Sequence, residues 1–339
     1  MTIYFSSIFI FLVIGYCYNK SDQNLKIIIN VFCIIILTMV YGFRFEVGAD
    51  WFNYIHALDL YNKKVSLTES LEIGYRSLNI LSASFGYGII GVNVVCSFLF
   101  FLFTIIAISR LGLNPYFFLA IVAPYHLVMS GMNYTRQSVA ISFVIMAVSC
   151  FLSNNKKSLF SYILLAATFH KSAIIFIILG ILDWKKRFLI PVAGLISSIS
   201  IFFMFNEYSE LYISSSRYDS SGLILRYGYL IFCFIIILGF IKNRQVELAC
   251  IRIVQFFCIS VLILALLSLF STTAADRLSY YYILIGTFLV YYFSYYYQPK
   301  YRLYYLSCLF SVSLVALVVW AVFGNISKYY IFKHYFFIN

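Results

Sequence analysis

The sequence predicts an all-α integral membrane protein with about 10–12 transmembrane helices in a single polytopic domain, residues 1–339. The chain is 63% hydrophobic and 11% charged, whereas a soluble domain is about 45–50% apolar and about 25% charged. Apolar runs of about 18 residues, long enough to cross a bilayer as helices, recur from end to end. They do not alternate apolar and polar residues as β-barrel strands do. These observations exclude a water-soluble globular protein.

The expected spans follow one another closely, without room for a soluble domain between them. In chain order they are 3–18, 25–42, 88–108, 115–129, 137–152, the broken segment 158–182, 187–205, 224–241, 252–270, 280–297 and 303–323. The first run, Ile3 to Tyr18, resembles the core of a signal peptide. It has no basic residue before it and no small-residue cleavage site after it, so we expect it to remain as a span.

The segment 158–182 is unusual because His170 and Lys171 lie in the middle of an apolar run. Polar groups at this depth are costly unless they face protein or water. The basic loops on both sides of the segment also predict the same face of the membrane. Two interpretations are equally supported: a re-entrant pair of half-helices with an outward apex, or one continuous span with a local exception to the positive-inside tendency.

Basic residues cluster in short loops, which we assign to the cytoplasm. These residues are Lys20, Lys26, Arg110, Lys156, Lys157, Lys185 to Arg187, Lys242, Arg244, Arg252, Lys300 and Arg302. The net charge of +12 therefore reflects membrane topology, and we expect no nucleic acid partner. The main extracytoplasmic loop is then about 43–75 and the second about 206–223, with shorter outer loops near 130–136 and 271–279.

The outer loop 43–75 combines cations, carboxylates and aromatic rings. Arg44 can hold a pyrophosphate by bidentate hydrogen bonds, Asp50 and Glu72 can bind sugar hydroxyls or accept a proton, and Tyr54 offers a flat face to a sugar ring. Taken alone, this stretch favours a loop folded on its own Arg–Asp pairs.

Two further candidate sites lie at the start of one span and in the middle of another. Asn133-x-x-Arg136-Gln137 places a guanidinium at the start of an apolar helix, where anions are favoured. Snorkelling arginines are common at span ends, so in isolation Arg136 is better explained as one of them. His170 lies in mid-segment, where an ionisable residue suggests function. A structural histidine bonded between helices is the main alternative.

The remaining candidates are Arg217, Arg226, Asp276 and Arg277, all beside membrane entries on the same expected face. No Walker loop, dinucleotide fingerprint, zinc-protease helix or nucleophile elbow is present. The eight cysteines lack the spacing of a metal site or a loop disulfide. We therefore expect no metal and no cofactor.

Five short motifs, read in order, resemble the EpsG-type branch of the Wzy polysaccharide polymerases. They are Arg44-x-x-x-Gly48-x-Asp50-x-x-Asn53-Tyr54, Glu72-x-Gly74-Tyr75, Asn133-x-x-Arg136-Gln137, Phe169-His170-x-Ser172 and Asp276-Arg277-x-x-x-Tyr281. Arg217 and Arg226 match no motif and carry over only weakly. The resemblance implies a bacterial inner-membrane glycosyltransferase that joins undecaprenyl-diphosphate-linked repeat units into O-antigen or exopolysaccharide, with its active site facing the periplasm.

The resemblance also implies roles for the candidates. Arg44, Arg136 and Arg277 would stabilise the leaving diphosphate, and His170 or Asp50 would accept the proton of the attacking hydroxyl. The other substrate-binding candidates are Asn133, Gln137, Asp276, Glu72, Tyr54, Arg217 and Arg226. The partners implied are the donor and acceptor glycans, the lipid bilayer and, as a candidate, a chain-length regulator.

Three other functions compete with polymerisation. An O-antigen ligase would use the same donor and a similar set of arginines. A polysaccharide flippase or transporter would show repeat symmetry and polar residues at mid-membrane, whereas the polar groups here gather at one interface. A membrane scaffold would leave the arginines and His170 without a role.

Overall fold

The computed structural model describes residues 2–62, 72–182, 220, 222–241 and 247–337. The N-terminal half contains α1 (Thr2–Lys20), α2 (Gln23–Gly42), α3 (Trp51–Asn62), α4 (Ile73–Ser84), α5 (Gly88–Ser109), α6 (Pro115–Val122), the π-helix η1 (Ala123–Gly131), α7 (Thr135–Leu152), α8 (Lys156–Phe169), the 3-10 helix η2 (Lys171–Ile177) and α9 (Ile178–Leu182). The rest contains α11 (Leu223–Ile241), α12 (Leu248–Leu267), α13 (Thr272–Tyr296), η4 (Pro299–Tyr301), α14 (Arg302–Phe323), η5 (Ser327–Tyr330) and η6 (Tyr335–Phe337).

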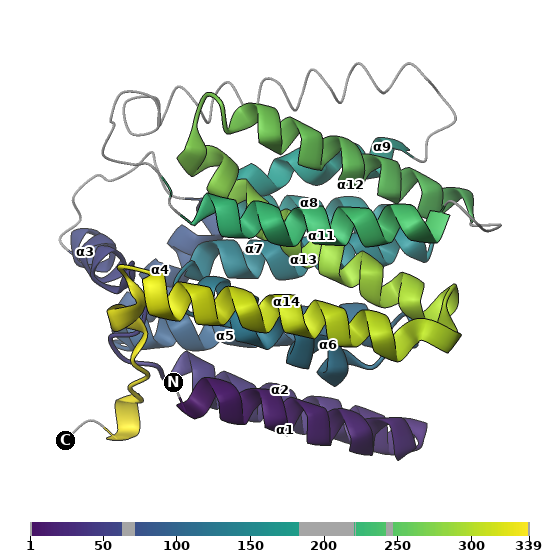
Figure 1. Ribbon diagram of the computed structural model, residues 1–339. Helices are drawn as coiled ribbons and strands as arrows, with labels where there is room; N and C mark the ends of the chain where they lie inside the picture. Colours follow the sequence, from purple (N-terminus) through teal and green to yellow (C-terminus); the bar gives the residue numbers. More distant parts are fainter. Residues whose placement is uncertain (1, 63–71, 183–219, 221, 242–246, 338–339) are drawn as a thin grey trace.

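The described chain is helical, with an isolated β-bridge but no named strand, and confirms an all-α polytopic fold. Seven described helices are long and apolar enough to cross a membrane, and two shorter apolar helices, Pro115–Gly131 and Lys171–Gly180, accompany them. The expected span 187–205 lies outside the described residues. Figure 1 shows the long helices side by side, with α3, α4 and the C-terminal end of the chain at the same end of the bundle.

Burial separates inner helices from outer ones. In α7, 89% of the apolar window is buried inside the protein, compared with 33% in α1 and in α2. The outer helices expose large apolar side chains such as Phe9 and Phe32. Such a surface is stable against lipid but costly against water. Because α7 is enclosed, the residues at its first turn have fixed protein neighbours.

Helix α13 begins earlier than the sequence predicted. The side chain of Ser271 accepts a hydrogen bond from the backbone N–H of Ala274, so Ser271 caps the helix and the expected outer loop 271–279 is helical. A serine at this position satisfies a backbone donor that the helix itself leaves unpaired. As a result Asp276 and Arg277 lie within the first turns of α13, on different sides of the helix.

The predicted break at His170 is confirmed. Helix α8 ends at Phe169, His170 has extended backbone angles (φ −152°, ψ 115°), and the chain continues as a 3-10 helix. A Cβ atom placed on Gly180 would lie 2.3 Å from Cζ of Phe160. The segment after the break therefore packs back along α8, which supports the re-entrant interpretation over one continuous span.

The expected loop 43–75 is helical over much of its length, because α3 and the start of α4 lie within it. The C-terminal segment covers its first part. The backbone N–H of Phe45 donates to the carbonyl of Lys333 (2.9 Å), and that of Gly48 donates to the carbonyl of Tyr329 (2.9 Å). The segment 43–50 is therefore held between the bundle and the C-terminal residues.

Candidate functional site

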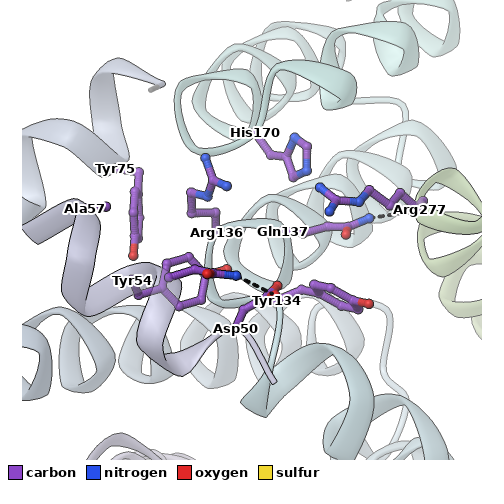
Figure 2. Close-up of a pocket in the computed structure, with 10 residues that line it drawn as sticks. Asp50, Tyr54, Ala57, Tyr75, Tyr134, Arg136, Gln137, His170 and Arg277 are labelled. Atoms are coloured by element: carbon purple, nitrogen blue, oxygen red, sulfur yellow. Dashed lines mark hydrogen bonds between the residues drawn. The ribbon is translucent and has the colours of Figure 1, made fainter. Parts of the chain in front are cut away.

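A polar cavity of ≈ 150 Å³ opens at the end of the bundle where α3, α4, α7, α13 and the break after α8 meet (Figure 2). Its walls come from segments far apart in the sequence. The lining residues are Asp50, Asn53, Tyr54, Ala57, Tyr75, Tyr134, Arg136, Gln137, His170 and Arg277. Six of the twelve residues that the sequence singled out therefore share one cavity: Asp50, Tyr54, Arg136, Gln137, His170 and Arg277.

The charged lining residues are two cations and one acid: Arg136, Arg277 and Asp50. Burial raises the pKa of Asp50 above its usual value, and the positive charges of Arg277 and Arg136 oppose that rise. With Asp50 ionised and His170 neutral, the lining carries a net positive charge. Such a cavity favours an anionic ligand.

The position of Asp50 depends on Asn133. The amide oxygen of Asn133 accepts a hydrogen bond from the backbone N–H of Asp50 (2.9 Å), and the side chain of Asn53 donates to Oδ1 of Asp50 (3.4 Å). Gly48 makes this approach possible: its φ is +105°, and a Cβ there would lie 2.8 Å from the carbonyl oxygen of Met132. Asn133 thus positions a wall of the cavity and is itself buried outside it.

Tyrosine rings form the other walls. The guanidinium carbon of Arg136 lies 5.9 Å from the ring centre of Tyr54 and 5.6 Å from that of Tyr75. Burial raises the pKa of Tyr54 to about 12, so its phenol stays neutral and can donate a hydrogen bond. The cavity therefore combines guanidinium donors with flat apolar faces.

Two contacts connect the cationic side of the cavity to its neighbours. Nε2 of Gln137 donates to the backbone carbonyl of Arg277 (2.5 Å), which joins the first turns of α7 and α13. NH1 of Arg136 donates to Oε2 of Glu72 (3.1 Å). Figure 2 shows Arg136, Arg277 and His170 directed toward the same space.

Arg44, expected to bind diphosphate, lies elsewhere. Its side chain is only 1% exposed, and it donates to the carbonyl of Tyr41 (2.9 Å), to Asn93 (2.9 Å) and to Thr135 (2.9 Å). These bonds join α2, α5 and the start of α7. The structure thus gives Arg44 protein acceptors away from the cavity, so its contact with a diphosphate stays a prediction.

Arg226 and Asp276 also lie outside the cavity lining. They form an ion pair with each other, with side chains 5% and 8% exposed, and Arg226 donates to the hydroxyl of Tyr280. This buried pair ties α11 to α13. Arg217 lies outside the described residues.

Four lining residues were not among the sequence candidates: Asn53, Ala57, Tyr75 and Tyr134. Asp50, Asn53, Tyr54 and Ala57 follow the spacing of one helix face. That signal would have found Ala57 if α3 had been predicted as a helix. Tyr134, between Asn133 and Arg136, gave no signal in the sequence.

No group of three His, Cys, Asp or Glu side chains that could hold a metal ion occurs within the described residues. The cationic groups that face the cavity are those of the arginines.

The fold and the cavity define a multi-pass membrane protein with a polar, positively charged pocket at one end of its helical bundle. The model of the EpsG family matches residues 27–336, nearly the whole chain, so the chain belongs to the EpsG family, which comprises Wzy-type polysaccharide polymerases. No curated protein and no solved structure matches the chain.

Proposed function

We propose that this protein polymerises undecaprenyl-diphosphate-linked oligosaccharide repeat units at the outer face of the bacterial inner membrane. The observation that carries the proposal is the cavity in which Arg136, Arg277, Asp50 and His170 meet, in a member of a polysaccharide polymerase family. The product would be an O-antigen or exopolysaccharide.

The chemistry of the substrate matches the cavity in three respects. A guanidinium binds phosphate oxygens by paired hydrogen bonds, and two of them, on Arg136 and Arg277, line the cavity. Sugar rings pack against aromatic faces, which Tyr54, Tyr75 and Tyr134 supply. The polyprenyl tails would lie against the lipid-exposed apolar surfaces of the bundle.

In the reaction, a hydroxyl at the non-reducing end of the acceptor attacks the anomeric carbon of the donor glycan. The new C–O bond forms while the bond from that carbon to the diphosphate oxygen breaks, and the hydroxyl proton passes to a base. The developing negative charge on the leaving diphosphate is stabilised by Arg136 and Arg277. His170 and Asp50 are the base candidates, since both line the cavity.

The outward orientation rests on the basic loops at the other end of the bundle. A reporter fused after residue 154 should be cytoplasmic, and one fused near residue 62, at the end of α3, should be periplasmic. The reverse pattern would place the cavity on the wrong side of the membrane for this function.

The direct test uses the full-length protein in proteoliposomes with a synthetic undecaprenyl-diphosphate oligosaccharide as donor and acceptor. We expect a ladder of products, lost in Arg277→Gln and retained in Arg110→Gln. Arg110 is a suitable control because it lies at the C-terminal end of α5, outside the cavity lining, and donates to Cys150. Transfer of one unit without a ladder would indicate a ligase, and translocation without transfer would indicate a flippase; either result overturns the proposal.

A further inference from the structure

Glu72 lies behind the cavity wall and joins three parts of the fold. Its Oε2 accepts from Arg136 (3.1 Å), its Oε1 accepts from the backbone N–H of Lys171 (3.3 Å), and the same Oε1 lies 3.6 Å from Nδ1 of His170. The Glu72 side chain is 4% exposed, compared with 26% for Arg136 and 20% for His170. The carboxylate therefore contacts protein groups on several sides, and two of the three residues it contacts, Arg136 and His170, line the cavity.

These contacts favour hydrogen on one ring nitrogen of His170, Nδ1. An ionised carboxylate can only accept hydrogen bonds, so Oε1 of Glu72 favours a proton on the nearby Nδ1. The hydroxyl oxygen of Ser172 lies 3.3 Å from the same nitrogen and 3.3 Å from the hydroxyl oxygen of Tyr281. Ser172 can therefore accept from Nδ1–H while it donates to Tyr281. Within the described part of the chain, Nε2 of His170 has no hydrogen bond, so its lone pair remains available.

We propose that Glu72 is a positioning residue that holds His170 in the Nδ1–H tautomer, which presents the lone pair of Nε2 to the attacking sugar hydroxyl. This inference rests on the proposed function, and it replaces the expectation that Glu72 binds substrate. The hydroxyl proton passes to Nε2 as the new C–O bond forms and the diphosphate leaves with the electrons of the broken bond. The carboxylate of Glu72 stabilises the imidazolium without taking a proton itself.

The tautomer can be measured without activity, by ¹⁵N magnetic resonance of the full-length protein in bilayers with labelled histidine. The chain has four histidines, and His170→Gln identifies the signal of His170 by its loss. We expect Nδ1 protonated and Nε2 unprotonated in the wild type. In Glu72→Gln the amide can donate to Nδ1, so we expect the Nε2–H tautomer to appear. Glu247→Gln makes the same chemical change at the N-terminus of α12 and should leave the signal unchanged.

Activity gives a second, separate measure. Glu72→Gln should lower kcat about 10²-fold, the lower part of the range for general-base catalysis, while the KM changes less than about twofold because Arg136 keeps its ring contacts. In a His170→Gln background the same substitution should have little further effect. A wild-type Nε2–H tautomer, an unchanged His170 signal in Glu72→Gln, or a KM effect alone would each overturn the positioning role. If the wild type makes no polymer but holds the Nδ1–H tautomer, the proposed function fails and the tautomer assignment stands.

Discussion

Replacing Arg136 with lysine keeps the positive charge and tests whether the planar guanidinium is required. One amino group of Arg136 is bonded to Oε2 of Glu72 at 3.1 Å, and the guanidinium also lies over the rings of Tyr54 and Tyr75. A guanidinium has five donors on three nitrogens, so it can keep Glu72 and still bind a diphosphate. A lysine ammonium presents its donors from one atom and cannot reproduce this arrangement.

The size of the effect follows from the donor that is lost. Removing one donor to a developing anion lowers kcat by about 10²–10³, or about 2.7–4 kcal/mol. Because lysine keeps its charge in the cavity, we expect Arg136→Lys to lie near the lower end, with kcat reduced about 10²-fold. A conservative change at a surface arginine would have almost no effect.

The assay is the rate of glycan ladder formation in nanodiscs, at equal amounts of folded protein. Arg302→Lys is the matched control: Arg302 lies 4.4 Å over the ring of Tyr295, at the opposite end of α13 from the cavity, and should retain full activity. A normal ladder with Arg136→Lys would show that Arg136 is an interfacial anchor, and the argument for diphosphate binding at this residue would be lost.

Three further predictions concern His170, Asp276 and Asp50. His170→Gln should lower the rate of polymer formation about 10²–10⁴-fold at normal protein abundance, since glutamine accepts no proton near neutral pH; a full ladder at the wild-type rate would remove His170 from the base candidates. Asp276→Ala should reduce the yield of folded protein by leaving Arg226 unpaired in the interior, at a cost of about 3–5 kcal/mol, whereas Arg226→Met with Asp276→Leu should recover much of it; equal thermal stability of the single variant and the wild type would contradict this. Because burial raises the pKa of Asp50, activity that needs its carboxylate should fall as the pH drops through that raised pKa, and Asp50→Asn should lower the rate and remove this acidic limb; an unchanged pH–rate profile would argue against a role for the carboxylate.

The sequence by itself determined the class of protein and most of its long apolar helices. Long apolar runs have few stable alternatives to helices in a bilayer, because each backbone polar group must be bonded internally. The break at His170 was also predictable, since polar groups in mid-run stand out against an apolar background. The motifs were sufficient for the family, which the match over residues 27–336 confirms.

Only the tertiary structure decided which candidates share a cavity. Arg44 and Arg136 are both arginines near span ends, yet one is enclosed by acceptors from three helices and the other lines the cavity. Asp276 and Arg277 are adjacent in sequence, but the rotation of α13 buries the first against Arg226 and directs the second into the pocket. The difference depends on helix start and rotation, which Ser271 and its neighbours determine. A shift of one residue turns a helix by about 100°, so composition and motif order predict the bundle but not which side chains meet in it.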